Sequence, residues 1–204
     1  MSDARLPFIA ILRGVTPADV LVHASVLAAQ GFEAVEVPTN SPDWATSVRR
    51  LAADYGDALA VGAGTVLSVD DVDALAATGA KLMVTPNTDS AVIRRAKEKG
   101  LRAVIGAMTP TEALAAVAAG ADALKIFPAS VVGPRFANII KAVLPRPVPL
   151  YAVGGITPAN LATYADGGWS GYALGGELYR PGQSVNDTEA KATAFRRAWE
   201  ELRR

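Results

Sequence analysis

The sequence predicts a (β/α)₈ TIM barrel, an α/β fold, formed as a single domain by residues 1–204. Short runs rich in Val, Ile, Leu and Ala alternate with Ala-rich amphipathic segments along the whole chain, which is the pattern of βα units. The strand-like runs number eight, which is the count that closes a parallel barrel. No linker or change in composition marks a second domain. We expect the strands at 8–12, 34–37, 58–62, 82–85, 103–105, 123–126, 150–153 and 171–174.

Ser and Thr residues mark the expected helix starts, because their hydroxyl groups can cap free backbone N–H groups in the first turn. Proline follows four of them, at the first helical position, where a missing N–H costs nothing. Glycines mark the helix ends, because they adopt the left-handed conformation there. The expected N-caps are Thr16, Ser41, Ser68, Thr109 and Thr157, and the expected terminal glycines are Gly31, Gly79, Gly100, Gly120 and Gly167 or Gly168.

An open doubly wound sheet is the alternative fold. It normally has fewer strands and would need a dinucleotide-binding glycine fingerprint to support it. Gly62-Ala63-Gly64 lacks the third glycine at the required spacing. The barrel is therefore the prediction, and no cofactor is expected.

Composition excludes several classes of function. The 20 basic and 20 acidic residues balance, so we expect neither a nucleic-acid nor a membrane partner. The chain has no cysteine and a single histidine, His23, in an Ala-rich helical stretch where a packing role is expected. A transition-metal cluster or a Ser-His-Asp triad therefore has too few ligands and bases, and no metal is expected. Without a signal peptide or membrane-spanning run, the expected compartment is the cytoplasm.

Lys125 is the first candidate catalytic residue, because chemistry in these barrels lies at the carboxyl ends of the strands. It stands inside the apolar run Asp122-Ala-Leu-Lys-Ile-Phe-Pro128. Burial disfavours an ammonium ion and lowers its pKa, which makes the amine a nucleophile toward a carbonyl group. A structural ion pair is the alternative, but we favour a Schiff base.

Glu36 is the second candidate, inside the apolar run Ala34-Val-Glu-Val-Pro38. It could pair with Lys125, or it could act as a general acid and base with a pKa raised toward neutrality. The two roles are compatible. A buried lysine together with a buried glutamate is more specific than either residue alone.

Paired glycines after the last two strands indicate a phosphate site. Gly154-Gly155 and Gly175-Gly176 let backbone N–H groups approach an anion closely at the ends of strands seven and eight. Glycines that simply permit tight turns are the alternative. Glu177 follows the second pair, where it would repel a phosphate unless its side chain turns away.

Four further residues at strand ends are candidates for binding substrate. Arg13 could clamp a carboxylate or phosphate with two hydrogen bonds, or form a salt bridge with Glu36 or a helix carboxylate. The hydroxyl of Thr65 could bind a carboxylate. Pro86 and Asn87 could shape the wall beside Lys125.

Several of these segments together resemble the class I aldolases of the 2-keto-3-deoxy-6-phosphogluconate/galactonate group. The similarity follows the chain in order over nearly its whole length. The matching segments are Glu36-Val-Pro, Gly62-Ala-Gly-Thr-Val-Leu67, Val84-Thr-Pro-Asn87, Met108-Thr-Pro-Thr-Glu-Ala113, Leu124-Lys-Ile-Phe-Pro128 and Val153-Gly-Gly-Ile-Thr-Pro158.

The resemblance implies a lyase of carbohydrate metabolism that cleaves a phosphorylated 2-keto-3-deoxy sugar acid to pyruvate and D-glyceraldehyde 3-phosphate. It implies Lys125 as the Schiff-base residue, Glu36 as the acid/base, and no metal. It also implies substrate contacts at Thr65 and Phe127, phosphate at the two glycine pairs, and a homotrimer.

Two positions favour the galactonate branch and hence galactonate degradation. Asn40 stands where gluconate enzymes carry arginine, and Val153 stands where they carry threonine. Arg13 and the segment Leu178-Tyr179-Arg180 also resemble the galactonate enzymes. The two substrates are C4 epimers, so a hydroxyl lost at Val153 could decide between them. The gluconate epimer stays the alternative substrate.

Other functions remain as alternatives. A pentulose-phosphate epimerase needs metal-binding histidines, and His23 is the only one. A thiamine-phosphate synthase needs an acidic site for Mg²⁺ and diphosphate, for which no residues are evident. A non-catalytic sugar-phosphate-binding barrel is the more remote alternative.

Overall fold

The computed structural model describes residues 6–204 and confirms the predicted barrel. Eight parallel strands close in chain order, and β8 pairs back to β1. The strands are β1 (Leu6–Ile11), β2 (Phe32–Pro38), β3 (Ala60–Gly64), β4 (Leu82–Val84), β5 (Arg102–Ala107), β6 (Ala123–Ile126), β7 (Leu150–Val153) and β8 (Gly171–Leu174).

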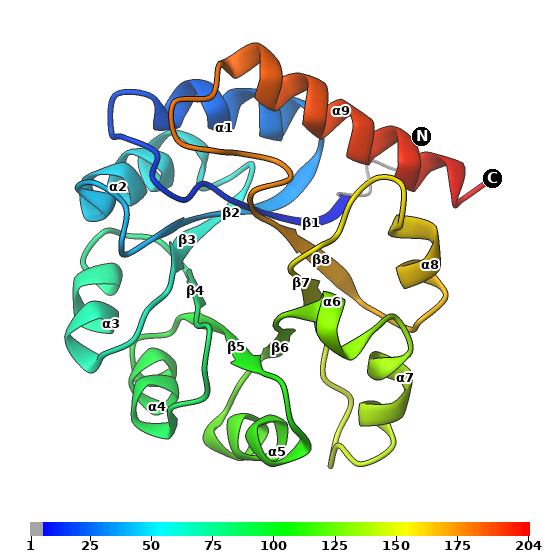
Figure 1. Cartoon of the computed structure of the whole chain (residues 1–204). Coiled ribbons are helices and arrows are strands. Elements are labelled where there is room, and N and C mark those ends of the chain that lie inside the picture. The colour runs from blue at the N-terminus through cyan, green and yellow to red at the C-terminus, as the bar shows by residue number, and fades with distance from the viewer. Residues whose placement is uncertain (1–5) are drawn as a thin grey trace.

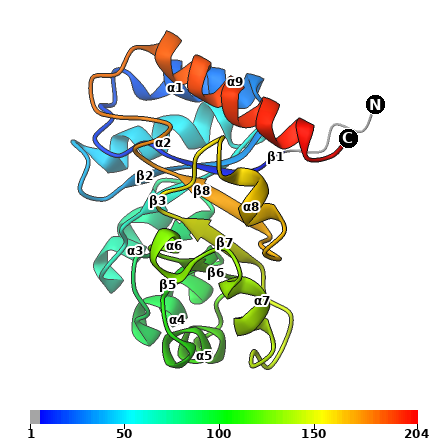
Figure 2. The ribbon, with the colours of Figure 1, turned by 45° about the vertical axis from the view of Figure 1, so that its right-hand side comes forward.

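Helices surround the strands on the outside, as Figure 1 shows in a view along the barrel. The last helix, α9, lies beside α1 in both views and completes the ring (Figure 2). No helix within residues 6–204 is long and apolar enough to cross a membrane. The helices are α1 (Val20–Ala29), α2 (Trp44–Tyr55), α3 (Val69–Ala76), α4 (Ser90–Glu98), α5 (Pro110–Ala119), α6 (Ala129–Val132), α7 (Phe136–Lys141), α8 (Leu161–Ala165) and α9 (Val185–Glu201).

The barrel interior is a small apolar core that ends in charged side chains at one end. Alternate residues of a strand point to the same face, so Ala34 and Glu36 of β2 share the interior face, as do Ala123 and Lys125 of β6. Ala34 and Ala123 belong to the inner apolar cluster. Glu36 and Lys125 lie one layer further toward the carboxyl ends, where both side chains remain buried. The two-residue period of the strands thus places the charged groups of Glu36 and Lys125 in the same layer of the barrel interior.

The opposite end of the barrel is closed by a polar network. The Arg102 guanidinium donates to Glu33 Oε1 at 2.9 Å and to the Tyr151 hydroxyl at 2.8 Å, and that hydroxyl donates to Glu33 at 3.0 Å. These bonds give hydrogen-bond partners to the charged groups of Arg102 and Glu33, which are partly buried and need such partners. This floor separates the inner core from solvent.

Strand β3 begins two residues later than expected. Ala58 and Leu59 belong instead to the turn that ends α2, where both amides donate to the Tyr55 carbonyl at 2.9 and 2.8 Å. The shift places Gly64 inside the strand, paired with Pro38 of β2. Gly64 consequently lies beside Glu36.

Two of the five expected N-caps are confirmed. Ser68 accepts from the Asp71 amide, and Thr109 forms a reciprocal capping box with Glu112. The expected terminal glycines are also confirmed, with φ between 71° and 108° at Gly31, Gly79, Gly100, Gly120 and Gly168.

The N-caps expected at Thr16, Ser41 and Thr157 are wrong, because α1, α2 and α8 begin three or four residues later. Their hydroxyl groups bond within the loops that precede the helices. Ser41 Oγ accepts from the Gly14 amide at 2.9 Å and ties two loops together at the barrel mouth. Ser/Thr-Pro therefore marks loop structure here, not the first helical turn.

Candidate active site

A cavity of about 390 Å³ opens at the carboxyl ends of the strands. This is the end where parallel barrels place their chemistry. Ten of the sequence-predicted site residues line it, namely Arg13, Thr65, Pro86, Lys125, Phe127, Val153, Gly154, Gly155, Gly175 and Gly176. The structure therefore brings residues from six strand ends to one hollow.

Lys125 lies at the base of this cavity and is 5 % exposed. Burial lowers the pKa of the ammonium group, Glu36 opposes that shift, and Arg13 adds to it. The Nζ atom lies 5.5 Å from the centre of the Phe127 ring. The lowered pKa leaves a larger share of Lys125 as the neutral amine, which is the form that attacks a carbonyl group.

Glu36 lies on β2, across the barrel interior from Lys125 on β6, and is 1 % exposed. Burial raises the pKa of its carboxyl group to about 7, and the charges of Lys125 and Arg13 with a hydrogen bond from Gly64 limit the rise. Its Oε2 atom is buried without a hydrogen-bond partner among the described residues. A carboxyl group with this pKa can both accept and return a proton near neutral pH.

Lys125 and Glu36 do not form an ion pair, which was the alternative for Lys125 and one of the two compatible roles of Glu36. No carboxylate oxygen of the described residues lies within 4.0 Å of Lys125 Nζ. The two groups interact through their charges over a longer distance.

Arg13 is held by two polar side chains, and not by the carboxylates considered for it. Its guanidinium donates to Asn40 Oδ1 at 2.5 Å and to the Thr65 hydroxyl at 3.3 Å. Both partners are neutral, so the positive charge of Arg13 stays available to an anion. The sequence singled out Asn40 only because gluconate enzymes carry arginine at this position. Its contact with Arg13 was not predicted.

Thr65 has an unusual backbone conformation, with φ of 55°. A β-branched residue rarely adopts this left-handed region, and strain of this kind concentrates at functional sites. The Thr39 hydroxyl holds it by donating to the Thr65 carbonyl at 2.7 Å. The conformation places the Thr65 hydroxyl beside Arg13 at the cavity wall.

One of the two glycine pairs has a left-handed backbone conformation. Gly154 and Gly155 have φ of 94° and 79°, which favours glycine. Their carbonyl oxygens accept from the Ser130 amide at 3.2 Å and from Asn160 Nδ2 at 2.8 Å. The amides of both glycine pairs donate to no other described residue, so they are available to a ligand.

Two predicted site residues do not line the cavity. Glu36 is not part of the cavity lining, and its charge raises the pKa of Lys125. Asn87 is exposed outside it, where its carbonyl accepts from the Thr85 hydroxyl at 2.6 Å. His23 does not line the cavity either, and it packs against Tyr179 and bonds Thr188.

Several lining residues were not expected to bind substrate. Most gave no clear signal, because apolar strand residues and loop charges are common in any barrel. Glu177 had been noted beside the second glycine pair, and Tyr179 and Arg180 only for their resemblance to the galactonate enzymes. The unexpected lining residues are Ile11, Ile156, Ala173, Leu174, Glu177, Tyr179, Arg180 and Pro181.

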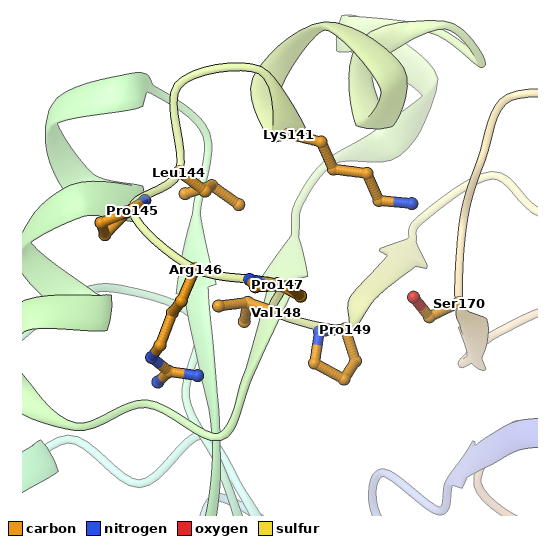
Figure 3. Close-up of a pocket in the computed structure, with 8 residues that line it drawn as sticks. All are labelled: Lys141, Leu144, Pro145, Arg146, Pro147, Val148, Pro149 and Ser170. Carbon is orange, nitrogen blue, oxygen red and sulfur yellow. The ribbon is translucent and has the colours of Figure 1, made fainter.

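A larger hollow of about 820 Å³ lies at the other end of the molecule. Figure 3 shows its walls, which come from the segments that enter β7 and β8. Its two cations already have partners, because Arg146 donates to the Ala121 carbonyl at 2.7 Å and Lys141 to the Gly168 carbonyl. With neither a buried lysine nor a carboxylate in its wall, we assign it no chemistry.

Comparison with known proteins gives consistent matches over most of the chain. The family model for KDPG and KHG aldolases matches residues 3–193. The 2-dehydro-3-deoxy-6-phosphogalactonate aldolase of Escherichia coli strain K12 is 51% identical over 98% of this chain and 97% of its own. The 2-dehydro-3-deoxy-phosphogluconate aldolase of Pseudomonas aeruginosa strain PAO1 is 32% identical over 78% of this chain and 70% of its own.

Solved structures of similar proteins also share the fold. The solved structure described as "Native KDPGal structure" superposes with a TM-score of 0.94 at 50% identity. The match covers 98% of this chain and 97% of that one.

Proposed function

Since the chain belongs to the KDPG and KHG aldolase family, we propose that it cleaves 2-dehydro-3-deoxy-6-phosphogalactonate to pyruvate and D-glyceraldehyde 3-phosphate. The observation that carries this proposal is the cavity that joins buried Lys125 to the two glycine pairs. A keto group at one end of the substrate and a phosphate at the other fit those two features. The similarity to the Escherichia coli galactonate enzyme supports the choice of substrate.

The first chemical step is formation of the Schiff base. The neutral Lys125 amine attacks the C2 ketone to give a carbinolamine. Glu36, as the carboxylic acid, gives a proton to the C2 hydroxyl, which leaves as water and yields the iminium ion. The raised pKa of Glu36 keeps part of the carboxyl group protonated for this transfer.

Cleavage follows from the electron demand of the iminium ion. The Glu36 carboxylate, directly or through one water molecule, takes the proton of the C4 hydroxyl. The C4–O bond becomes a carbonyl, the C3–C4 bond breaks, and its electron pair moves through C2 to the iminium nitrogen. Glyceraldehyde 3-phosphate leaves and an enamine remains on Lys125. Protonation at C3 and hydrolysis then release pyruvate and the free amine.

Arg13, Thr65, Pro86, Phe127 and Val153 form the walls around this chemistry. We assign Arg13 and the Thr65 hydroxyl to the substrate carboxylate, because they are joined by a hydrogen bond and leave the positive charge unpaired. Asn87 keeps only an indirect role, through the Thr85 hydroxyl that bonds both its carbonyl and the Gly106 amide.

Borohydride reduction in the presence of pyruvate tests the mechanism. Reduction should link pyruvate to Lys125 irreversibly, and peptide mass spectrometry should locate the added mass there. Release of pyruvate from the two C4-epimeric substrates tests the specificity, with the galactonate epimer expected to react faster. Absence of pyruvate release from both would leave the non-catalytic sugar-phosphate barrel as the better description.

Two further proposals concern the whole protein. We propose a homotrimer, as in the family that the sequence resembles. Val131, Ile139 and Val143, in and beside α6 and α7, are 66%, 68% and 55% exposed and would be buried by contact between subunits. Light scattering of the purified protein measures the subunit number. A cytoplasmic location stays a prediction from the sequence.

A further inference from the structure

The loop between β8 and α9 carries a cation into the cavity. Arg180 lines the cavity together with Gly175 and Gly176. Its Nε atom donates to the Gly176 carbonyl at 3.1 Å. Its two terminal amino groups have no partner among residues 6–204. The guanidinium is therefore held through Nε, while its two terminal amino groups are free to bind a ligand.

The backbone that holds Arg180 is fixed before any ligand binds. The amides of Leu178 and Tyr179 donate to the Gly175 carbonyl at 2.8 and 2.9 Å, and the Gln183 amide donates to the Arg180 carbonyl at 3.0 Å. Leu178 and Tyr179 are buried, and the Tyr179 ring packs edge-on against His23. Little backbone ordering is left to be done when an anion arrives, so a contact to Arg180 would lose little entropy.

A neighbouring loop also packs against this segment. A Cβ atom built on Gly14 would lie 2.6 Å from Pro181 Cγ, so the loops after β1 and β8 touch at the mouth. This contact fixes the residue that follows Arg180. Contacts on both sides of the loop therefore hold the backbone at Arg180.

The charges in the cavity leave the phosphate end short of a cation. Arg13 is already hydrogen-bonded to Asn40 and Thr65, and Lys125 is needed as the neutral nucleophile. The glycine pairs offer only neutral N–H groups to a phosphate that carries close to two negative charges. Glu177 also lines this end and adds a negative charge. Arg180 is the remaining cation of the described lining.

We propose that Arg180 binds the phosphate group of the substrate. Its terminal amino groups would meet two phosphate oxygens in the planar geometry that guanidinium favours, while Nε keeps its bond to Gly176. The inference rests on the proposed function for the identity of the substrate, and it adds a binding residue to it. Arg180 then contributes to binding of phosphorylated ligands and has no part in Schiff-base formation.

The test compares Arg180→Gln with wild type and with Arg197→Gln, which removes the same charge from an exposed position on α9. Arg180→Gln should raise KM for the phosphorylated substrate about 10- to 100-fold, as loss of a charge-assisted pair of hydrogen bonds predicts. Arg180→Lys should recover part of the loss. Exchange of the pyruvate methyl protons with deuterium, which needs no phosphate, should stay within about twofold of wild type in all variants.

Direct binding keeps this test separate from the proposed function. Titration with inorganic phosphate or glyceraldehyde 3-phosphate should show a Kd about tenfold or more higher for Arg180→Gln than for Arg197→Gln, whether or not the enzyme turns over. An unchanged Kd and KM would overturn the role of Arg180. Equal losses in phosphate binding and pyruvate exchange would also overturn it, because they would indicate a damaged fold. Absence of pyruvate release from wild type with normal phosphate binding would overturn only the proposed function.

Discussion

The Glu36 carboxylate occupies the space in which a side chain on Gly64 would lie. A Cβ atom built on Gly64 would come within 2.0 Å of Glu36 Oε2, and Gly64 also supplies a hydrogen bond to that carboxyl group. The carboxylate is thus positioned by the absence of a side chain on the neighbouring strand.

Gly64→Ala should therefore lower turnover about 10- to 100-fold, because general acid and base catalysis of this order depends on a correctly placed group. Steady-state pyruvate release measures it. Gly62→Ala is the contrast on the same strand, since its Cβ would lie 1.8 Å from the Leu82 carbonyl oxygen, which is backbone. Gly62→Ala should lower the melting temperature more than Gly64→Ala does. Full activity of Gly64→Ala would show that Glu36 tolerates displacement.

The pKa of about 7 for Glu36 predicts the acid limb of the pH profile. The carboxylate is the base that takes the C4 hydroxyl proton, so kcat should fall by about tenfold per pH unit below pH ~7. Glu36→Gln should lose activity by ~100-fold or more and should flatten this limb. Stopped assays from pH 5 to 8 provide the comparison, and an acid limb near pH 4.5 in wild type would argue against a buried base.

The same pKa predicts a cost in stability. Glu36 keeps its proton up to pH ~7 when folded and loses it near 4.5 when unfolded, so between these values the folded state binds more protons. The free energy of unfolding then falls as pH rises through this range. From about 4.5 to about 7 the loss is on the order of 3 kcal/mol.

Glu36→Gln removes that titration. Chemical unfolding at several pH values should show the variant gaining stability relative to wild type as pH rises from 5 to 8. Parallel curves for the two proteins would contradict the raised pKa.

The buried pair of Lys125 and Glu36 was predictable because charged side chains stood within apolar strands. Lys125 and Glu36 are the only charged residues of the apolar runs 123–128 and 34–38, and the period of a strand sends both into the interior. The eight strands were predictable for the same reason, since their apolar runs are separated by glycines that end the helices. Burial is the physical property that the sequence records most directly.

The parts that could not be predicted lie in the loops. Arg180 and Asn40 occupy exposed loop positions, where a polar residue is ordinary and its partner depends on how other loops pack. The N-caps expected at Thr16, Ser41 and Thr157 were wrong for this reason, because their hydroxyl groups serve loop contacts. The left-handed backbone of Thr65 also had no signal, since the residue type itself disfavours it.

The link from Asn40 to Arg13 predicts coupling between two exposed residues. Arg13→Ala should raise KM about tenfold for both epimers if it binds the carboxylate that they share. Asn40→Ala should have a smaller effect of the same kind, because it only frees the guanidinium from one partner. The double variant should be no worse than Arg13→Ala alone, and additive losses in a double-mutant cycle would show that the two act independently.

Substitution of Val153 offers the sharpest test of substrate choice. Replacing it by threonine changes the chemistry of one cavity wall while keeping the size of the side chain. The side chain is 4% exposed and lines the cavity between Lys125 and the first glycine pair. Threonine is nearly isosteric with valine but adds a hydroxyl that can bond the C4 hydroxyl of one epimer. Val153→Thr should shift the ratio of kcat/KM toward the gluconate epimer by about 10-fold or more, which is the range that one such contact supplies. Val153→Ala removes bulk without adding a hydrogen bond, so it should lower both activities and leave the ratio nearly unchanged. If alanine shifts the ratio as far as threonine does, the shape of the wall, and not a hydrogen bond, selects the epimer.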